Sequence, residues 1–549
     1  MKLSKSIGIV AMVIASVTAG SALGGNKFVN PKGWDKHVRM KPLRDVNPDP
    51  DIVEVYLEAK EAKVRFTSGE KTKVYTYNGV IPGPLIEAKK GDTLIVHFTN
   101  NLPEPTTIHW HGVELPADMD GSIVSQNPIP PGGTFRYEFP LNDASLFWYH
   151  PHVRSNEQVE KGLAGALLVR DDEYDRELGL PQDELVMVLD DILLNENGQV
   201  EEFFAGTPEE ILLEKINGRE GNTLLVNGHE LPTIKVRSGI PLRLRLVNIS
   251  NTRFFNVAIP GHKLTRIGGD GGLLETPLYD LDSVLLVPGE RADVVFTPIG
   301  HRGEELFVQW HDVERGRHSI TIADGKVMMG DDPMDGQYPP ISIMRIKIRG
   351  GGDPFAQEYV APAFLRTIEP IDVSGASIQT LKFGHTMPMP NGDISFTING
   401  KRYDQVTLDD APDAFVGETQ VWNLVNMTGG DHPFHLHGFF FQVLEVIYKD
   451  EFGNVIGHEP APYLELKDTV NLVRRPGPKG SVSVTKIAVK FDPKERSVED
   501  VIAYGGPDAR VNADLDNGVR GVSGGWQFHC HILEHADSGM MSYFELKAR

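Results

Sequence analysis

One phrase of sequence is repeated three times along this chain of 549 residues. Each copy has an asparagine–glycine pair, then a second glycine, then an alternating apolar and polar run that ends in asparagine. The copies start at Asn78-Gly79, Asn227-Gly228 and Asn399-Gly400, and their runs end at Asn100, Asn248 and Asn426. An asparagine–glycine pair beside alternating segments is a strong signal for a tight turn between β-strands. The repeat therefore predicts three similar β domains in tandem.

The repeated runs also indicate which side of each strand faces a core. The fifth and seventh residues after the second glycine are apolar in every copy: Val96 and Phe98, Leu244 and Leu246, Trp422 and Leu424. Because side chains alternate along a strand, both members of a pair lie on one face. A proline–glycine turn followed by another strand recurs at 131–132, 288–289 and 476–477. We therefore predict an all-β chain of three Greek-key β-sandwich or barrel domains.

The chain is too long for a single hydrophobic core, so boundaries between domains are expected. We place them near 172, after the acidic run 171–173, and near 351, in the glycine-rich linker 350–354. The predicted domains are then 51–172, 173–350 and 351–549. Residues 25–50 contain four prolines and form an extended leader that either wraps the first domain or is mobile.

The first 24 residues have the three parts of a secretory signal peptide. Lys2 and Lys5 precede an apolar run over residues 7–19, and small residues follow it. The run is too short to cross a bilayer, which makes a membrane anchor or a buried strand the weaker interpretation. We expect cleavage near Ala22 or Gly24, export to the periplasm or out of the cell, and no membrane attachment afterwards.

Charge narrows the range of partners. Acidic residues number 76 and basic residues 54, which gives a net charge of −22. Nucleic acid is an unsuitable partner, because binding to phosphates needs a basic surface. The negative field instead attracts cationic substrates. We take the protein to be a monomer.

Only one cysteine occurs in the chain, and a histidine stands on each side of it. It is Cys530, and Met540 follows ten residues later. A thiolate, an imidazole and a weak thioether are ligands of a blue-copper electron-transfer site, which usually takes a second histidine from elsewhere in the fold. His432 supplies that histidine. The alternative, an inert buried cysteine, leaves the two flanking histidines without a packing reason.

Four His-x-His pairs stand out: His109 and His111, His150 and His152, His435 and His437, His529 and His531. Both rings of such a pair project from one face of a strand, so several pairs brought together present many imidazoles to a small volume. Two pairs belong to the first predicted domain and two to the third, which predicts a multinuclear metal site at their interface. Imidazole suits copper, zinc or iron, but the lone thiolate is poorly matched to a closed zinc site. The middle domain has only His262 near the equivalent position, so we expect it to bind no copper and to act as a spacer.

These motifs, in this order, resemble those of the three-domain multicopper oxidases, the family of laccases, bacterial copper-efflux oxidases and ascorbate oxidase. The resemblance covers nearly the whole chain after the signal peptide, and it implies three cupredoxin-like domains and four copper ions. It implies that His432, Cys530 and His535 hold the type 1 copper, with Met540 as the axial ligand. It further implies that the type 2 copper is held by His109 and His435, and the type 3 pair by His111, His150, His152, His437, His529 and His531.

The resemblance also implies the reaction. Four one-electron oxidations of a reducing substrate are coupled to the reduction of dioxygen to water, and Cys530 takes up each electron. Phenols and aromatic amines are the expected substrates, as in laccases. The alternative is a metal ion such as Cu(I), for which the methionines at 328, 329, 334, 344, 387 and 389 offer soft thioethers. A copper carrier or scaffold without activity is disfavoured, because no ligand position is lost.

Dioxygen reduction consumes protons, so an acidic group is expected near the cluster. Asp120 resembles the family's acidic residue beside the type 2 copper, although an ordinary aspartate–glycine turn is the competing interpretation. Bacterial relatives often carry a glutamate directly after the second type 1 histidine, where this chain has Ala536 followed by Asp537. The sequence leaves open whether Asp537 takes over proton delivery.

Overall fold

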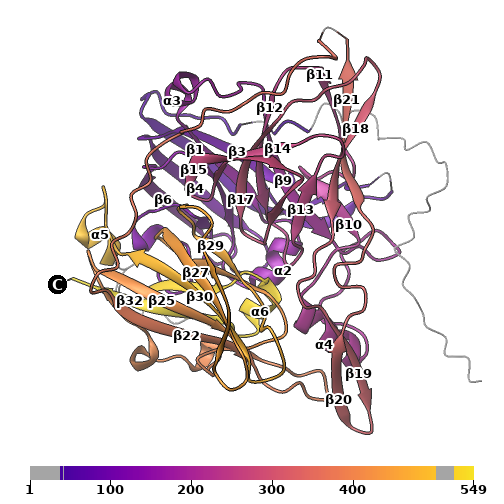
Figure 1. Ribbon diagram of the computed structural model, residues 1–549. Helices are drawn as coiled ribbons and strands as arrows, with labels where there is room; N and C mark the ends of the chain where they lie inside the picture. The colour runs from indigo at the N-terminus through magenta and orange to yellow at the C-terminus, as the bar shows by residue number, and fades with distance from the viewer. Residues whose placement is uncertain (1–37, 41, 68, 351, 503–524, 549) are drawn as a thin grey trace, which may run out of the picture.

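The computed structural model describes residues 38–40, 42–67, 69–350, 352–502 and 525–548, and it consists mainly of β-sheet (Figure 1). The predicted signal peptide lies outside these residues. Three β-sandwiches follow one another along the chain, and in each of them two sheets share an apolar core. Within the described residues, no helix is long and apolar enough to span a membrane.

The first sandwich consists of two four-stranded sheets. Their orders are β2 (Thr72–Tyr77), β1 (Ile52–Val64), β4 (Thr93–Asn101), β6 (Thr134–Pro140), and β3 (Gly83–Lys89), β8 (Gly165–Arg170), β7 (Leu146–His150), β5 (His109–His111). The short helices η1 (Ala117–Met119), α2 (Ser155–Glu160) and α3 (Asp172–Glu177) lie between and after these strands.

The middle sandwich has a six-stranded and a five-stranded sheet. The six-stranded order is β10 (Thr223–Val226), β9 (Glu184–Ile192), β12 (Leu242–Asn248), β17 (Arg291–Phe296), β14 (Leu264–Gly269), β15 (Gly272–Leu281). The five-stranded order is β11 (Thr233–Arg237), β21 (Ile341–Arg349), β18 (Glu305–His311), β13 (Phe255–Ala258), β16 (Ser283–Leu286). Helix α4 (Pro208–Asn217) and the hairpin of β19 (His318–Ala323) and β20 (Lys326–Asp331) extend from this sandwich toward the third one (Figure 1).

The third sandwich also has a six-stranded and a five-stranded sheet. The six-stranded order is β23 (Phe396–Ile398), β22 (Ser377–His385), β25 (Thr419–Asn426), β30 (Val482–Lys490), β27 (Phe441–Lys449), β28 (Val455–Pro460). The five-stranded order is β24 (Asp413–Phe415), β32 (Met541–Lys547), β31 (Gly525–Cys530), β26 (His432–Leu436), β29 (Thr469–Leu472). Its short helices are η2 (Tyr403–Gln405), η3 (Leu408–Asp410), α5 (Val498–Ile502) and α6 (Leu533–Asp537).

The repeated phrase corresponds to one arrangement of strands, used three times. Its alternating runs form β4, β12 and β25, and each is parallel to the first strand of its sandwich, β1, β9 or β22. On the other side, each is antiparallel to the strand that follows the proline–glycine turn. The six apolar residues predicted to face a core are at most 1% exposed, which confirms the predicted faces.

The asparagine that ends each run has a role that the sequence left unexplained. The Nδ2 atom of Asn426 donates hydrogen bonds to three backbone carbonyls at 2.9, 3.0 and 3.2 Å, and its Oδ1 accepts one from the N–H of Thr428 at 2.9 Å. Asn100 and Asn248 make the same kinds of bonds in the other two sandwiches. Each asparagine therefore fixes the loop after its strand, and in the third sandwich that loop leads to His432.

Apolar packing joins the sandwiches to one another. One cluster of buried apolar side chains runs through the first and third sandwiches and includes Leu212 and Ile216 of α4. Two residues of the described part of the leader contact the sandwiches: Val38 is 1% exposed in the middle core, and the N–H of Leu43 donates to the carbonyl of Leu85 at 2.6 Å. Residues 25–37 of the predicted leader lie outside the described residues, so its wrapping of the first domain stays a prediction.

Candidate metal centres

Each histidine pair lies on a strand or spans the end of one, and these strands hydrogen-bond to each other within each sandwich. In the first sandwich, β5 carries His109 and His111, and His109 lies opposite His150 of β7. In the third, His435 of β26 lies opposite His529 of β31. Strand pairing thus gathers histidines that are far apart in the sequence, and the two sandwiches present them to each other.

All eight paired histidines are buried where the first and third sandwiches meet. Nε2 of His109 lies 3.4 Å from Nε2 of His435, and Nε2 of His529 lies 3.2 Å from Nε2 of both His152 and His437. Their ligand atoms form compact groups, each within 4.8 Å: His111, His150 and His531; His152, His437 and His529; His109, His111 and His435. The structure brings every predicted trinuclear ligand together and divides the six type 3 candidates into two triads.

The state of these rings calls for a bound cation. Burial lowers the pKa of His150, His437 and His531 well below the usual value, so the rings are neutral at pH 7. Among the described residues, Nδ1 of His111, Nε2 of His150 and both ring nitrogens of His531 have no hydrogen-bond partner. Buried polar atoms without partners are costly, and a metal ion removes that cost. A cluster of neutral imidazoles fits copper.

A second group of ligands lies inside the third sandwich. Nδ1 of His432 lies 3.1 Å from Nδ1 of His535, and the two atoms lie 3.5 and 3.7 Å from Sγ of Cys530. Burial raises the pKa of the Cys530 thiol, so a thiolate at this position needs a cation beside it. Met540 is completely buried, and its carbonyl accepts a hydrogen bond from the N–H of Cys530 at 3.0 Å. The thiol and the two imidazoles are three of the donors of a blue-copper site, and Met540 is the fourth that the sequence predicts.

Comparison with known proteins agrees with this geometry. Models of multicopper oxidase domains match residues 58–174, 174–306 and 379–548. The chain belongs to the multicopper oxidase family. It is similar to a laccase of Bacillus subtilis (strain 168), with 29% identity over 90% of this chain and 97% of the relative. It is also similar to the multicopper oxidase mco of Staphylococcus aureus, with 27% identity over 96% of this chain and 94% of the relative.

Solved structures show the same relationship. A multicopper oxidase from Campylobacter jejuni, described as a metallo-oxidase, superimposes with a TM-score of 0.71 and 26% identity, covering 93% of this chain and 94% of that one. The predicted family, all-β cupredoxin-like fold and enzyme class are thereby confirmed. This multicopper oxidase is a copper-dependent oxidoreductase that uses dioxygen, and its histidine clusters match the four coppers that the family binds.

Asp120 lies beside the trinuclear site of this multicopper oxidase. It is 2% exposed, Oδ1 is 3.3 Å from Nδ1 of His109, and Oδ2 is 2.9 Å from Nδ1 of His437. Burial alone would raise the pKa of Asp120, but the charge and hydrogen bond of His109 outweigh it and lower the pKa. The carboxylate therefore stays ionised while it orients two candidate ligands.

A second carboxylate at the cluster was missed in the sequence. Oδ1 of Asp468 is 3.1 Å from Nε2 of His111, and its backbone carbonyl is 2.9 Å from Nδ1 of His435. Arg291, a buried residue of the middle sandwich, donates to Oδ1 of Asp468 at 2.7 Å. Neither residue belongs to a recognisable motif, because interdomain packing alone makes them neighbours of the histidines.

The middle sandwich also reaches the type 1 group. Nε2 of His535 hydrogen-bonds to the backbone carbonyl of Ile216, at the end of α4, at 3.0 Å. Nε2 of His432 pairs with the hydroxyl of Thr428 at 2.8 Å. Both Nε2 atoms are therefore occupied by hydrogen bonds, and His535 and His432 are only 2% and 1% exposed. The middle sandwich does more than the predicted role of spacer, because α4 contacts the candidate type 1 ligand His535.

The acidic residues after the cysteine motif hold the domains together. Asp537 is the exposed last residue of α6, and its Oδ2 accepts a hydrogen bond from the N–H of Asn156 in α2 of the first sandwich at 2.7 Å. Glu534 is fully buried and accepts hydrogen bonds from Asn251 at 2.8 Å and Thr252 at 2.9 Å, both in the middle sandwich. Short helix α6 thus contacts both other domains.

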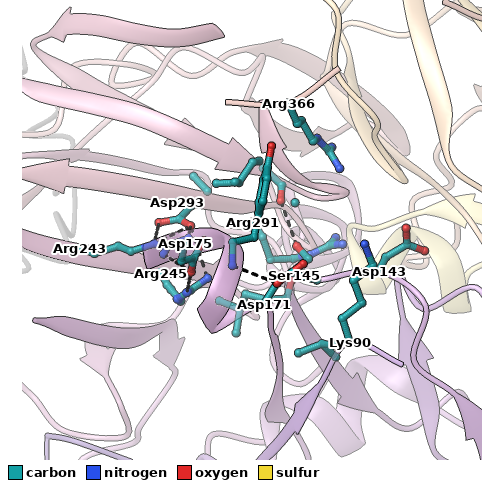
Figure 2. A pocket seen from close by; sticks show the side chains of 18 residues that line it. Lys90, Asp143, Ser145, Asp171, Asp175, Arg243, Arg245, Arg291, Asp293 and Arg366 are labelled. Carbon is teal, nitrogen blue, oxygen red and sulfur yellow. Dashed lines mark hydrogen bonds and ion pairs between the residues drawn. The ribbon is translucent and has the colours of Figure 1, made fainter. Parts of the chain in front are cut away.

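A cavity of about 100 Å³ lies between the first and middle sandwiches, and none of the candidate metal ligands lines it (Figure 2). Four of its charged residues form one network: Arg243 donates to Asp175 at 2.6 Å and to Asp293 at 2.5 Å, and Arg245 contacts the same two carboxylates. Arg291 also lines this cavity, and it donates a hydrogen bond to Asp468 at the trinuclear site. We assign this region to the joint between domains.

Proposed function

We propose that this multicopper oxidase takes its electrons from a small metal ion, Cu(I) above all, rather than from a bulky phenol. The observation that carries this proposal is the covered type 1 group, in which Nε2 of His535 is bonded to the carbonyl of Ile216. An aromatic substrate needs a concave apolar pocket in which its ring approaches a ligand edge. A metal ion needs only exposed donor atoms near the site, and the net charge of −22 attracts cations to the protein.

The roles of the residues follow from their positions. Copper at the two centres supplies one-electron chemistry and, at the trinuclear site, a Lewis acid for dioxygen. Cys530 joins the centres, because its sulfur faces His432 and His535 while the next residues on either side belong to the trinuclear triads. Asp120 holds His109 and His437 and is placed to assist proton delivery.

The test is a comparison of kcat/KM, with oxygen uptake as the signal, for Cu(I), Fe(II), Mn(II) and a series of phenols. We expect the largest value for Cu(I). A larger value for a phenol than for every metal ion would contradict the proposal.

Laccase-like oxidation of phenols and aromatic amines, the first expectation from the sequence, is the second candidate. It is favoured by relatives that carry the name laccase, from Bacillus subtilis and Bacillus stratosphericus, which match 90% and 92% of this chain. The same kcat/KM comparison decides between the two candidates.

We also propose that the protein is exported and acts as a monomer, with dioxygen and the reductant as its partners. The signal-like composition of residues 1–24 supports export. N-terminal sequencing of the mature protein is expected to begin beyond Ala22, and light scattering to give the mass of one chain. A mature chain that still begins at Met1 would overturn the proposal of export. A stable dimer would overturn the proposal of a monomer.

A further inference from the structure

We propose that electrons reach the type 1 group through a relay of two side chains, His385 as the surface ligand for Cu(I) and Phe396 as the bridge to His535. This inference rests on the proposed function and names its docking residue and electron route. A route of this kind is needed because the outward nitrogens of both type 1 histidines already have partners.

Phe396 makes the inner contact of the relay. Its ring stacks on the imidazole of His535, with centroids 3.9 Å apart and planes at 20°. The side chain is 2% exposed, so the stack is shielded from water. Close π contact between two rings provides strong electronic coupling over a short distance, and Phe396 is therefore well placed to carry an electron to His535.

His385 makes the outer contact. It is the last residue of β22, and it lies opposite Phe396, the first residue of β23. The centroids of the two rings are 5.9 Å apart. His385 is partly exposed, whereas Phe396 behind it is buried, so the pair leads from the surface to the type 1 group.

The free nitrogen of His385 is suited to a soft metal ion. Nδ1 lies 2.8 Å from the carbonyl of Thr386, so this nitrogen must carry the hydrogen and Nε2 keeps its lone pair. Nε2 has no hydrogen-bond partner among the described residues. Met387 and Met389, in the connection to β23, are 69% and 53% exposed. An imidazole with exposed thioethers nearby is a donor set that favours Cu(I).

The electron balance is simple. Cu(I) exchanges solvent ligands for Nε2 of His385 and neighbouring thioether sulfur, loses one electron and leaves as Cu(II). The electron passes across Phe396 to His535 and reduces the type 1 group by one. Four such electrons, with four protons from water, reduce one dioxygen to two waters, as the family reaction requires.

The test separates docking from electron transfer. Copper-loaded wild type, His385→Gln, Phe396→Leu and Phe396→Tyr are mixed anaerobically with increasing Cu(I), and bleaching of the blue band is followed by stopped flow. His458→Gln is the matched control, because His458 is an exposed histidine of β28, at the opposite edge of the same sheet from β23. Binding of Ag(I), a redox-inert analogue of Cu(I), is measured separately by equilibrium dialysis.

We expect His385→Gln to raise the half-saturating Cu(I) concentration at least about tenfold, as for loss of a metal ligand, and to weaken Ag(I) binding equally. Phe396→Leu is expected to lower the limiting bleaching rate at least about tenfold, without changing Ag(I) binding, and Phe396→Tyr to restore the rate. Reoxidation by dioxygen, the blue spectrum and the type 1 reduction potential should stay as in wild type. His458→Gln should change none of these quantities.

Wild-type kinetics and Ag(I) binding in both His385→Gln and Phe396→Leu would overturn the relay. If Cu(I) fails to bleach the wild type and a phenol succeeds, the proposed substrate fails, together with the docking role of His385. The route through Phe396 is then judged with the phenol, and an unchanged limiting rate in Phe396→Leu would overturn it as well.

Discussion

Single residues carry most of the chemistry of this oxidase, and Cys530 is the clearest case. Its sulfur lies with His432 and His535, while its neighbours His529 and His531 belong to the two trinuclear triads. In the proposed mechanism, one residue thus connects the place where electrons arrive with the place where dioxygen is reduced. The absence of any other cysteine from the sequence also means that no internal disulfide can compete for this thiolate.

Replacing this sulfur should separate the two centres. We expect Cys530→Ser to abolish the blue absorption and oxidation of every reductant, because a hydroxyl is a poor ligand for a blue-copper site. The copper bound by the histidine triads should remain, which metal analysis and electron paramagnetic resonance can check. Retention of both the blue colour and the activity would refute the assignment of the type 1 group.

Asp120 gives a second test at this scale. Asp120→Asn keeps the shape but removes the charge, so we expect reoxidation by dioxygen to slow about 100-fold, the typical loss when a proton-transfer group is removed. Copper content should stay the same. Asp118→Asn, at a less buried neighbouring aspartate, is the control and should reoxidise normally. Unchanged reoxidation in Asp120→Asn would exclude a role in proton delivery.

At the scale of elements, helix α4 is the part of the middle sandwich that matters most to the site. Its last turn gives the carbonyl that holds His535, and its Leu212 belongs to the core shared by the first and third sandwiches. Asn217, its last residue, also binds the hairpin β19–β20 through two hydrogen bonds with His318, at 2.7 and 2.8 Å. Helix and hairpin together form a cover over the type 1 group.

Weakening this helix should open the cover. The hydroxyl of Thr207 caps α4 by accepting from the N–H of Glu210 at 3.3 Å, and Thr207→Ala is expected to cost about 1 kcal/mol. That loss raises the population of molecules in which α4 is displaced from the type 1 group roughly fivefold. We therefore expect kcat/KM for a phenol to rise severalfold relative to Cu(I). Ser497→Ala removes a similar cap from α5 and is the control. An equal change in both variants would argue against a cover specific to α4.

At the scale of the whole molecule, the three sandwiches are joined by ion pairs across their interfaces, one buried and one partly buried. Arg291 of the middle sandwich pairs with Asp468 of the third, and Glu184 of the middle sandwich pairs with Arg170 of the first. These contacts explain why a middle domain without motif histidines is needed for the geometry of the metal centres. It fixes the first and third sandwiches relative to each other and adds groups to both sites.

The ion pair of Glu184 gives a prediction for acid stability. Burial would raise its pKa, but Arg245 and Arg170 lower it from 4.5 to about 2. Because the folded pKa is lowered, the stabilisation is complete above about pH 4.5 and is lost as the pH falls toward 2. Glu184→Gln should cost about 2 kcal/mol at pH 7 and almost nothing near pH 2. Melting temperatures measured against pH, with exposed Glu173→Gln as control, test this; a pH-independent difference would contradict it.

The sequence predicted the residues of the metal centres better than it predicted the contacts between domains. The histidines and Cys530 were predictable because each belongs to a short motif, and strand alternation determines where its side chains point. Asp468 and the carbonyl of Ile216 were not, since one lacks a motif and the other is a backbone atom that any residue would supply. Both act through interdomain contacts, and a single sequence records the residues on each side of an interface but not their pairing.

The most direct test of the central claim is the number of electrons consumed per dioxygen. Copper-loaded protein is given a measured, limiting amount of reductant, and oxygen uptake and hydrogen peroxide are recorded together. The cooperation of one type 1 group with a trinuclear site predicts four electrons per dioxygen and no peroxide. Two electrons per dioxygen with accumulation of peroxide, or no uptake by protein that holds all four coppers, would contradict the account.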